Sequence, residues 1–182
     1  PDDKSGRIPL LGDFEARMRR LGAAKGGWLV AVSGGPDSFA LLDLAYRSVH
    51  RTPRQLHAVT VHHHLRAEAE DELMAVRGWC DARNITHHRQ DLEPPANPAA
   101  ARRARYQALK TVAFEQNLPH ILLGHHADDQ VESILLALVR GAGPKGLGGM
   151  RDCRHLGGGI QVLRPFLETP GQTLRDHAQE HH

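Results

Sequence analysis

Apolar residues along the chain follow two patterns, short runs and longer stretches in which they recur every three or four residues. The short runs have strand length and cover residues 28–32, 56–61, 85–90 and 120–124. Each run is followed by a stretch with helical spacing. One helix is expected to begin at Phe39, and the others are expected over 68–84, 98–116 and 127–140. Strands that alternate with helices predict an α/β fold, a parallel twisted sheet with helices on both faces.

Two of these helices have a distinct apolar face. In the helix over 68–84 this face is formed by Leu73, Val76 and Cys80. In the helix over 127–140 the apolar positions are Val131, Ile134, Leu135 and Leu138. Because three- and four-residue spacing places side chains on one side of a helix, both helices are expected to pack against the core.

The last predicted elements come after a glycine-rich loop at 141–149. Gly157–Gly159 separates two short strand-like runs, which predicts a β-hairpin. A final helix is expected to start near Thr169. A helix is also expected to start at Asn97, since Asn is a good N-cap and proline follows it.

The N-terminal residues 1–27 are polar, with a short amphipathic piece at 14–21. They are predicted to be an extension of a domain that covers 28–182. The chain begins at Pro1 without methionine and ends within the last predicted helix. Both ends are therefore expected to be cuts in a longer protein.

The loop after the first strand carries the strongest chemical signal. Residues 33–38 read Ser-Gly-Gly-Pro-Asp-Ser between an apolar run and a helical pattern. Such a turn presents unpaired N–H groups at a helix N-terminus, which predicts phosphate binding, with Asp37 placed to hold a divalent cation. The alternative is an ordinary turn into a helix capped by Asp37 or Ser38. A Walker A loop and a dinucleotide fingerprint are excluded, because neither glycine spacing is present and no lysine follows.

A second polar cluster follows the fourth predicted strand, over residues 124–132. Its two adjacent carboxylates, Asp128 and Asp129, suit Mg²⁺ beside substrate phosphates. The alternative is helix capping, with Asp128 as N-cap. Ligands of parallel sheets bind at the carboxyl ends of the strands, so the loops at 33–38, 62–66 and 125–130 are expected to line one crevice.

Composition narrows the class of protein. The net charge of +2 excludes a global basic field, although arginines cluster at 102–105 and at 17–20. No apolar run is long enough for a membrane span, and no membrane partner is expected. Cys80 and Cys153 are far apart and suit reduced thiols, which predicts a cytoplasmic protein.

Ser33–Ser38 resembles the PP-loop of the N-type ATP pyrophosphatases, and further motifs resemble the tRNA(Ile)-lysidine synthetase family in particular. These motifs are Val61–Arg66, Ala100–Tyr106, Gly124–Glu132, Leu138–Met150 and Arg164–Leu167. One departure lies at His62-His63-His64-Leu65-Arg66, where the family has Asp-His-Gly-Leu-Arg, so only three of these five positions match. The family's C-terminal tRNA-binding domains are not part of this chain.

The resemblance implies a Rossmann-type, adenine nucleotide alpha hydrolase-like domain. It further implies that ATP adenylates the wobble cytidine of an isoleucine tRNA, and that free L-lysine then displaces AMP to give lysidine. ATP and Mg²⁺ are the implied cofactors, that tRNA and lysine the partners, and a homodimer is left open.

The resemblance also assigns residues to roles. The catalytic set is Asp37, Asp128 and Asp129, with Asp37 and Asp129 as Mg²⁺ ligands. The ATP-binding set is Ser33, Gly34, Gly35, Pro36, Asp37, Ser38, Val61 and His63. The lysine or tRNA set is Arg102, Arg105, His125, Gly143 and Gly146.

Three alternatives remain at this point. One is another PP-loop enzyme, such as a tRNA thiolase, although the chain lacks paired Cys-x-x-Cys motifs. Another is a metal-binding module, suggested by 14 histidines. The third is a nucleotide-binding module without catalysis.

Overall fold

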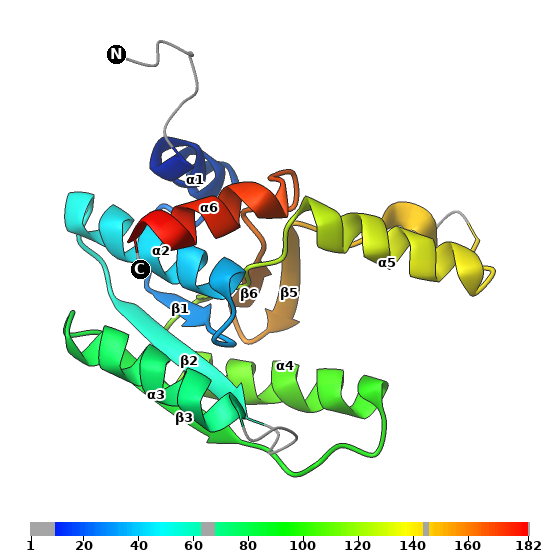
Figure 1. The fold of residues 1–182 in the computed structure, drawn as a ribbon, viewed down its shortest axis with the longest axis horizontal. Coiled ribbons are helices and arrows are strands. Elements are labelled where there is room, and N and C mark those ends of the chain that lie inside the picture. The colour runs from blue at the N-terminus through cyan, green and yellow to red at the C-terminus, as the bar shows by residue number, and fades with distance from the viewer. Residues whose placement is uncertain (1–9, 63–67, 144–145, 182) are drawn as a thin grey trace.

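Six strands form one sheet in the computed structural model, which describes residues 10–62, 68–143 and 146–181 (Figure 1). The strands are β1 (Trp28–Ala31), β2 (Leu56–His62), β3 (Thr86–Asp91), β4 (His120–Leu122), β5 (Cys153–Gly157) and β6 (Ile160–Leu163). Their order is β3-β2-β1-β4-β6-β5, and every neighbouring pair is parallel except β5 with β6. The predicted parallel sheet is confirmed, and the predicted hairpin adds its antiparallel edge.

The chain leaves β1 toward β2 and β3 and then returns to β4 on the other side of β1. Two strands whose connections run in opposite directions leave a crevice at their carboxyl ends, where ligands of open α/β sheets bind. In this sheet that crevice lies between β1 and β4.

Helices cover both faces of the sheet, as predicted. They are α1 (Leu10–Arg20), α2 (Pro36–Arg51), α3 (Glu68–Asp81), α4 (Pro98–Glu115), α5 (Ala127–Val139) and α6 (Gly171–His181), with a 3₁₀ turn, η1, at Gly146–Gly148. One core cluster joins the sheet to α1, α2, α3 and α6, and the other joins its opposite face to α4. The predicted face of α3 is buried, and the Asn97 side chain caps α4 by accepting from the Ala100 N–H at 2.8 Å.

The start of α2 differs from the sequence prediction. The helix begins at Pro36 rather than at Phe39, so half of the Ser33–Ser38 loop is its first turn. Gly35 is the N-cap, with extended backbone, and its cap position makes no side-chain hydrogen bond. Proline is well suited to the first helical position because its missing N–H would have no acceptor there. The alternative of a helix capped by Asp37 or Ser38 is therefore not what the structure shows.

The prediction that α5 packs against the core is also wrong. No residue of α5 is buried, and Val131, Leu135 and Leu138 are 57%, 54% and 59% exposed. Figure 1 shows why: α5 extends away from the sheet, with η1 and the chain around it beside it. Helical spacing predicts an apolar face, but only the tertiary arrangement decides whether that face meets a partner.

A buried polar contact holds α6 on α2. The carboxylate of Asp43, which is 4% exposed, accepts from the Arg47 guanidinium at 2.6 Å and lies 2.8 Å from His177 Nε2. Burial alone would raise the pKa of Asp43, but hydrogen bonds from His177 and Arg47, with their charges, outweigh it and lower that pKa. The ionised carboxylate thus stabilises the fold.

Replacing Asp43 by Asn is expected to lower the free energy of unfolding at pH 7 by about 1–3 kcal/mol, because two donors lose a charged acceptor. The stability that comes with the lowered pKa is fully present above the ordinary value of 3.8 and is lost as pH falls through the folded-state pKa, so the loss in the variant should shrink at low pH. Urea unfolding at pH 7 and pH 3 measures both effects. Asp81→Asn, in the exposed pair with Arg77 at 3.7 Å, is the control, and equal losses in the two variants would contradict the assignment.

Leucine-to-alanine substitutions should lower the unfolding free energy much less in α5 than in the core helices. Leu42→Ala in α2 removes a fully buried side chain and is expected to cost about 2–5 kcal/mol of unfolding free energy. Leu135→Ala in α5 is expected to cost less than about 0.5 kcal/mol, because the side chain is already half exposed and alanine is a good helix former. The same urea unfolding experiment compares them, and a large loss at Leu135 would show that α5 is packed in solution.

Candidate functional site

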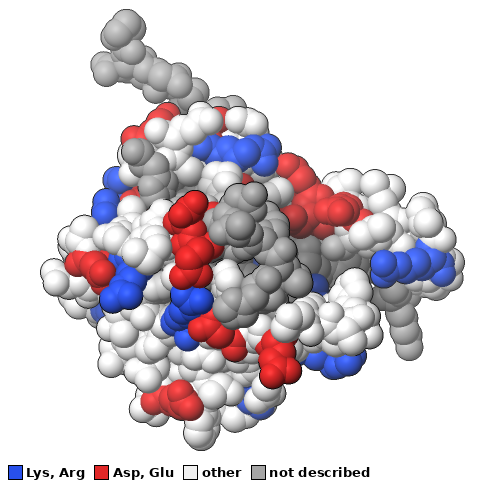
Figure 2. Space-filling view, turned by 60° about the horizontal axis from the view of Figure 1, so that its bottom comes forward, with Lys and Arg blue, Asp and Glu red and all other residues white. Residues whose placement is uncertain are grey.

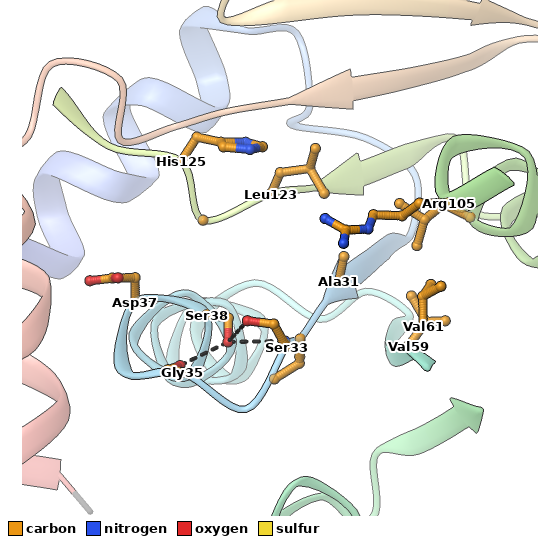
Figure 3. A pocket seen from close by; sticks show the side chains of 13 residues that line it. Ala31, Ser33, Gly35, Asp37, Ser38, Val59, Val61, Arg105, Leu123 and His125 are labelled. Carbon is orange, nitrogen blue, oxygen red and sulfur yellow. Dashed lines mark hydrogen bonds between the residues drawn. The ribbon is translucent and has the colours of Figure 1, made fainter. Parts of the chain in front are cut away.

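A cavity of about 230 Å³ lies at the carboxyl ends of β1, β2 and β4 (Figure 3). The loop after β1 contributes Ser33, Gly35, Asp37 and Ser38, β2 contributes Val59 and Val61, and the β4 end contributes Leu123, Gly124 and His125. Arg105 reaches in from α4. The predicted convergence is confirmed for the first and fourth strand ends, whereas residues 63–66 of the loop after β2 lie outside the described residues.

The two serines hold the loop in shape. The Ser38 hydroxyl donates to the Gly35 carbonyl at 2.8 Å and accepts from the Ser33 N–H at 3.1 Å. The Ser33 and Ser38 hydroxyl oxygens are 3.3 Å apart, and Figure 3 shows them facing each other. The N–H groups of Asp37 and Ser38 lie in the first turn of α2, where a helix offers no backbone acceptor. The loop therefore presents the positive end of α2 to the cavity.

Gly34 is required for a reason that the sequence alone does not reveal. Its φ of +89° lies in the left-handed region, which favours glycine. A Cβ built there would stand 2.5 Å from the Cβ of Glu72 on α3. Gly34 thus allows α3 to pack against the loop, in addition to the close phosphate approach expected for it.

Asp37 and Asp129 converge on His126. The imidazole Nε2 of His126 lies 3.5 Å from an Asp37 carboxylate oxygen and 3.6 Å from one of Asp129. The other oxygen of Asp37, Oδ1, is buried and has no hydrogen-bond partner among the described residues. An unpartnered buried carboxylate oxygen beside a second carboxylate fits a hard divalent cation such as Mg²⁺, which takes one or two carboxylates and substrate phosphates.

Asp128 lies apart from this pair. Its carboxylate is 3.8 Å from the opposite ring nitrogen of His126 and 3.9 Å from Arg175 on α6. The N-cap of α5 is His126, so the alternative of Asp128 as N-cap is not what the structure shows. Asp129 instead takes part in capping the N-terminus of α5, because its carboxylate accepts a hydrogen bond from the His126 backbone N–H at 2.8 Å.

His125 is neutral at physiological pH. Burial, followed by the positive charge of Arg164, lowers the pKa of His125 to about 4. A neutral imidazole in the cavity wall adds no positive charge beside Arg105. The face in Figure 2 shows acidic and basic side chains interspersed, in keeping with a net charge of only +2.

The other predicted residues that the structure describes do not line this cavity. Pro36 is in the first turn of α2 without lining it, and Arg102 stacks on Tyr106. Gly143 and Gly146 lie beyond the end of α5, and their assigned role stays a prediction. His63 lies outside the described residues.

Sequence reasoning missed three residues near the site. His126 lies in the predicted polar cluster at 124–132 without an assigned role, although its place before two acids is a signal for it. Tyr106 and Arg164 occur in the family-like motifs but received no role. The Arg164 guanidinium donates to the Tyr106 hydroxyl at 2.7 Å, a contact between residues 58 positions apart that no local pattern reveals.

Comparison with known proteins agrees with this geometry. Residues 11–182 match the family model of the PP-loop domain. A tRNA(Ile)-lysidine synthase of Methylobacterium nodulans is 42% identical over 168 residues, 89% of this chain and 49% of that protein. The bifunctional protein TilS/HprT of Listeria innocua is 38% identical over 162 residues, 84% of this chain and 25% of that protein. The chain thus spans between a quarter and a half of these curated relatives.

Among solved structures, the U34-tRNA thiolase NcsA from Methanococcus maripaludis, with its 4Fe-4S cluster, superposes with a TM-score of 0.76. The match covers 92% of this chain and 62% of that one at 18% identity, which shows a shared fold.

Gly34→Ala is expected to lower the free energy of unfolding by more than about 1 kcal/mol, because both its φ and the approach of Glu72 exclude a Cβ. Gly78→Ala on α3 is the matched control. Nothing lies within 4 Å of that position, so alanine there should stabilise the helix by about 0.5–1 kcal/mol. Thermal unfolding of both variants measures the contrast, and a neutral Gly34→Ala would refute the stated constraint.

Proposed function

The chain belongs to the PP-loop domain family, and from this we propose that it is the catalytic domain of an enzyme that uses ATP to attach lysine to the wobble cytidine of an isoleucine tRNA. The observation that carries the proposal is the buried, unpartnered oxygen of Asp37 at the N-terminus of α2, in a cavity lined by the PP-loop. Identity near 40% to tRNA(Ile)-lysidine synthases supports the choice of acceptor.

The reaction has two steps. The O2 oxygen of cytidine attacks the α-phosphorus of ATP, an O–P bond forms, the α–β anhydride bond breaks and pyrophosphate leaves. The neutral ε-amine of lysine then attacks C2, a C–N bond forms, the C2–O2 bond breaks and AMP leaves. The nitrogen loses a proton in the process, and because a lysine amine has an ordinary pKa of about 10.4, an acceptor for that proton is needed.

The PP-loop residues would act on the first step. The N–H groups of the first turn of α2 are placed to bind phosphate oxygens, in a loop whose shape the paired hydroxyls of Ser33 and Ser38 hold. Asp37 would hold Mg²⁺, which when bound supplies positive charge to the departing pyrophosphate. Val59 and Val61 offer an apolar wall for adenine, and Arg105 is placed for a phosphate.

The positions of Asp128 and Asp129 suggest which of them acts on lysine in the second step. Asp129 faces the same nitrogen of His126 as Asp37 does, so it is our choice for binding the lysine ammonium or accepting its proton. Asp128 faces α6 and Arg175, which leaves it less suited to either role. Because Asp129 is also held by the His126 N–H, its orientation is fixed before lysine arrives.

The alternatives receive less support. Cys80 is buried on α3, and burial raises the pKa of its thiol to about 12, which disfavours a metal-binding thiolate. Within residues 10–62, 68–143 and 146–181, no group of three or more histidine, cysteine or acidic side chains is placed to hold a metal ion. The same part of the chain contains no helix long and apolar enough to cross a membrane, and we propose a cytoplasmic site of action.

The test uses the full-length natural protein with ATP, Mg²⁺, bulk tRNA and labelled lysine. Wild-type protein is expected to attach labelled lysine to tRNA. Asp37→Asn is expected to reduce the rate by at least about 100-fold, because it removes the carboxylate charge that would hold Mg²⁺ beside the phosphates. Asp81→Asn, on the surface of α3, should retain the wild-type rate. ATP cleavage without lysine transfer would mean that the acceptor is wrong, and no cleavage by folded wild-type protein would refute the proposed function.

A further inference from the structure

Arg164 is a buried cation without a carboxylate. It directly follows β6, at the same edge of the sheet as the PP-loop, and the residue is only 3% exposed. Among the described residues, no acidic side chain lies within ion-pair distance of its guanidinium. Buried arginines are ordinarily paired, because removing the charge from water is costly unless an anion compensates it.

The partners that Arg164 does have are neutral. One terminal nitrogen donates to the Arg151 carbonyl at 2.6 Å and the other to the Tyr106 hydroxyl at 2.7 Å. The Nε–H is buried and has no acceptor within the described part of the chain. These contacts orient the guanidinium, but among the described residues they leave its charge uncompensated and its Nε–H without an acceptor.

Tyr106 brings two further arginines to the same place. The guanidinium carbons of Arg102 and Arg154 lie 5.3 and 5.0 Å from the centre of its ring, within the range of cation–π contact. Neither makes an ion pair with a described residue. Three guanidinium groups thus gather around one phenol, from α4, β5 and the end of β6. Solvent screens the two exposed ones, whereas Arg164 is shielded from solvent.

A cavity of about 320 Å³ lies against Arg164, between α1, the base of α5 and the β5–β6 hairpin. Arg17, Arg20 and Arg151 line it as well, with Asp152 and Glu168 as its acids. Glu168 is already engaged by Arg17 at 3.3 Å and by Arg20 at 3.7 Å. The positive charge of this cavity is therefore in excess, and the space is of the size of a small molecule.

This cavity is near the nucleotide cavity. His125 lines the cavity at the carboxyl ends of β1, β2 and β4, which the proposal assigns to ATP. The positive charge of Arg164 is one of the causes that lower the pKa of His125. A ligand group held by Arg164 would therefore lie beside the proposed reaction centre, at the same edge of the sheet.

We propose that Arg164, oriented by Tyr106, binds an oxyanion of a substrate, and that this oxyanion is the carboxylate of the free amino acid. The guanidinium fork matches a carboxylate, and a buried group reached through a small cavity suits a small ligand better than an RNA backbone. The inference rests on the proposed function for the identity of the amino acid. An RNA phosphate is the other source of the same chemistry, and the experiment distinguishes the two.

The test measures steady-state kinetics of lysine transfer by the full-length protein, with L-lysine and with cadaverine, which lacks the carboxylate. Arg164→Lys is expected to raise the KM for lysine by at least about tenfold and to reduce the preference for lysine over cadaverine by a similar factor. Tyr106→Phe, which removes only the hydroxyl, should raise the same KM by about threefold. Arg77→Gln, an exposed arginine on α3, is the control.

The outcomes separate the sources of the oxyanion. An unchanged KM for lysine with a raised KM for tRNA and a shallower salt dependence would assign Arg164 to an RNA phosphate. Loss of kcat alone, with both KM values unchanged in folded variants, would overturn the proposal and leave Arg164 with a structural role.

A second measurement does not need the enzyme's activity. Acetate and inorganic phosphate, titrated at constant ionic strength, should raise the unfolding temperature of wild-type protein in a saturable way, and less so in Arg164→Gln. If wild-type protein transfers no lysine but shows this difference, the proposed function fails and the oxyanion subsite stands. If the variant and the wild type respond alike, the subsite is refuted.

Discussion

The geometry of the site at the carboxyl edge of the sheet depends on how firmly α2 is held in place. Eight residues of this helix are buried, and the helix packs on β1 and β2, on α1 and on α6. Trp79 of α3 meets Tyr46 of α2 edge to face at 5.7 Å, so α3 supports it from a further side. A helix so enclosed cannot shift along its axis without losing core contacts on every side. Its N-terminal N–H groups therefore occupy a fixed position, which is what a phosphate cradle requires.

The turn into α2 is where that constraint is tightest. Gly34 must adopt a left-handed backbone, and Glu72 of α3 closes the space that a side chain would need. Gly124, on the other side, approaches the backbone of Asp37, since a Cβ there would lie 3.2 Å from the Asp37 carbonyl oxygen. The loops after β1 and β4 are thus pressed together. This contact helps to bring Asp37 and Asp129 to the same ring nitrogen of His126.

Charges at this edge are sorted by sign. The carboxylates of Asp37 and Asp129 stand together around His126, while Arg105 lines the cavity at the ends of β1, β2 and β4 and Arg164 lines the second cavity. His125 lies near both arginines, and its lowered pKa keeps it neutral between them. Such an arrangement offers a cation site beside one or two anion sites, which suits a substrate that carries phosphates and an amino acid that carries both charges.

Local patterns in the sequence determined most of the elements and the polar residues at their ends. The apolar runs predicted the strands, Asn97 and Pro98 predicted the start of α4, and the Ser-Gly-Gly-Pro-Asp-Ser segment predicted the turn from β1 into the N-terminus of α2, because each of these depends on interactions within a few residues. Only the tertiary structure decided that α5 has no core partner, that Asp129 rather than Asp128 joins Asp37, and that Tyr106 meets Arg164. These depend on contacts between residues far apart in the chain, and helical spacing or adjacency in sequence carries no record of which surface another element will cover.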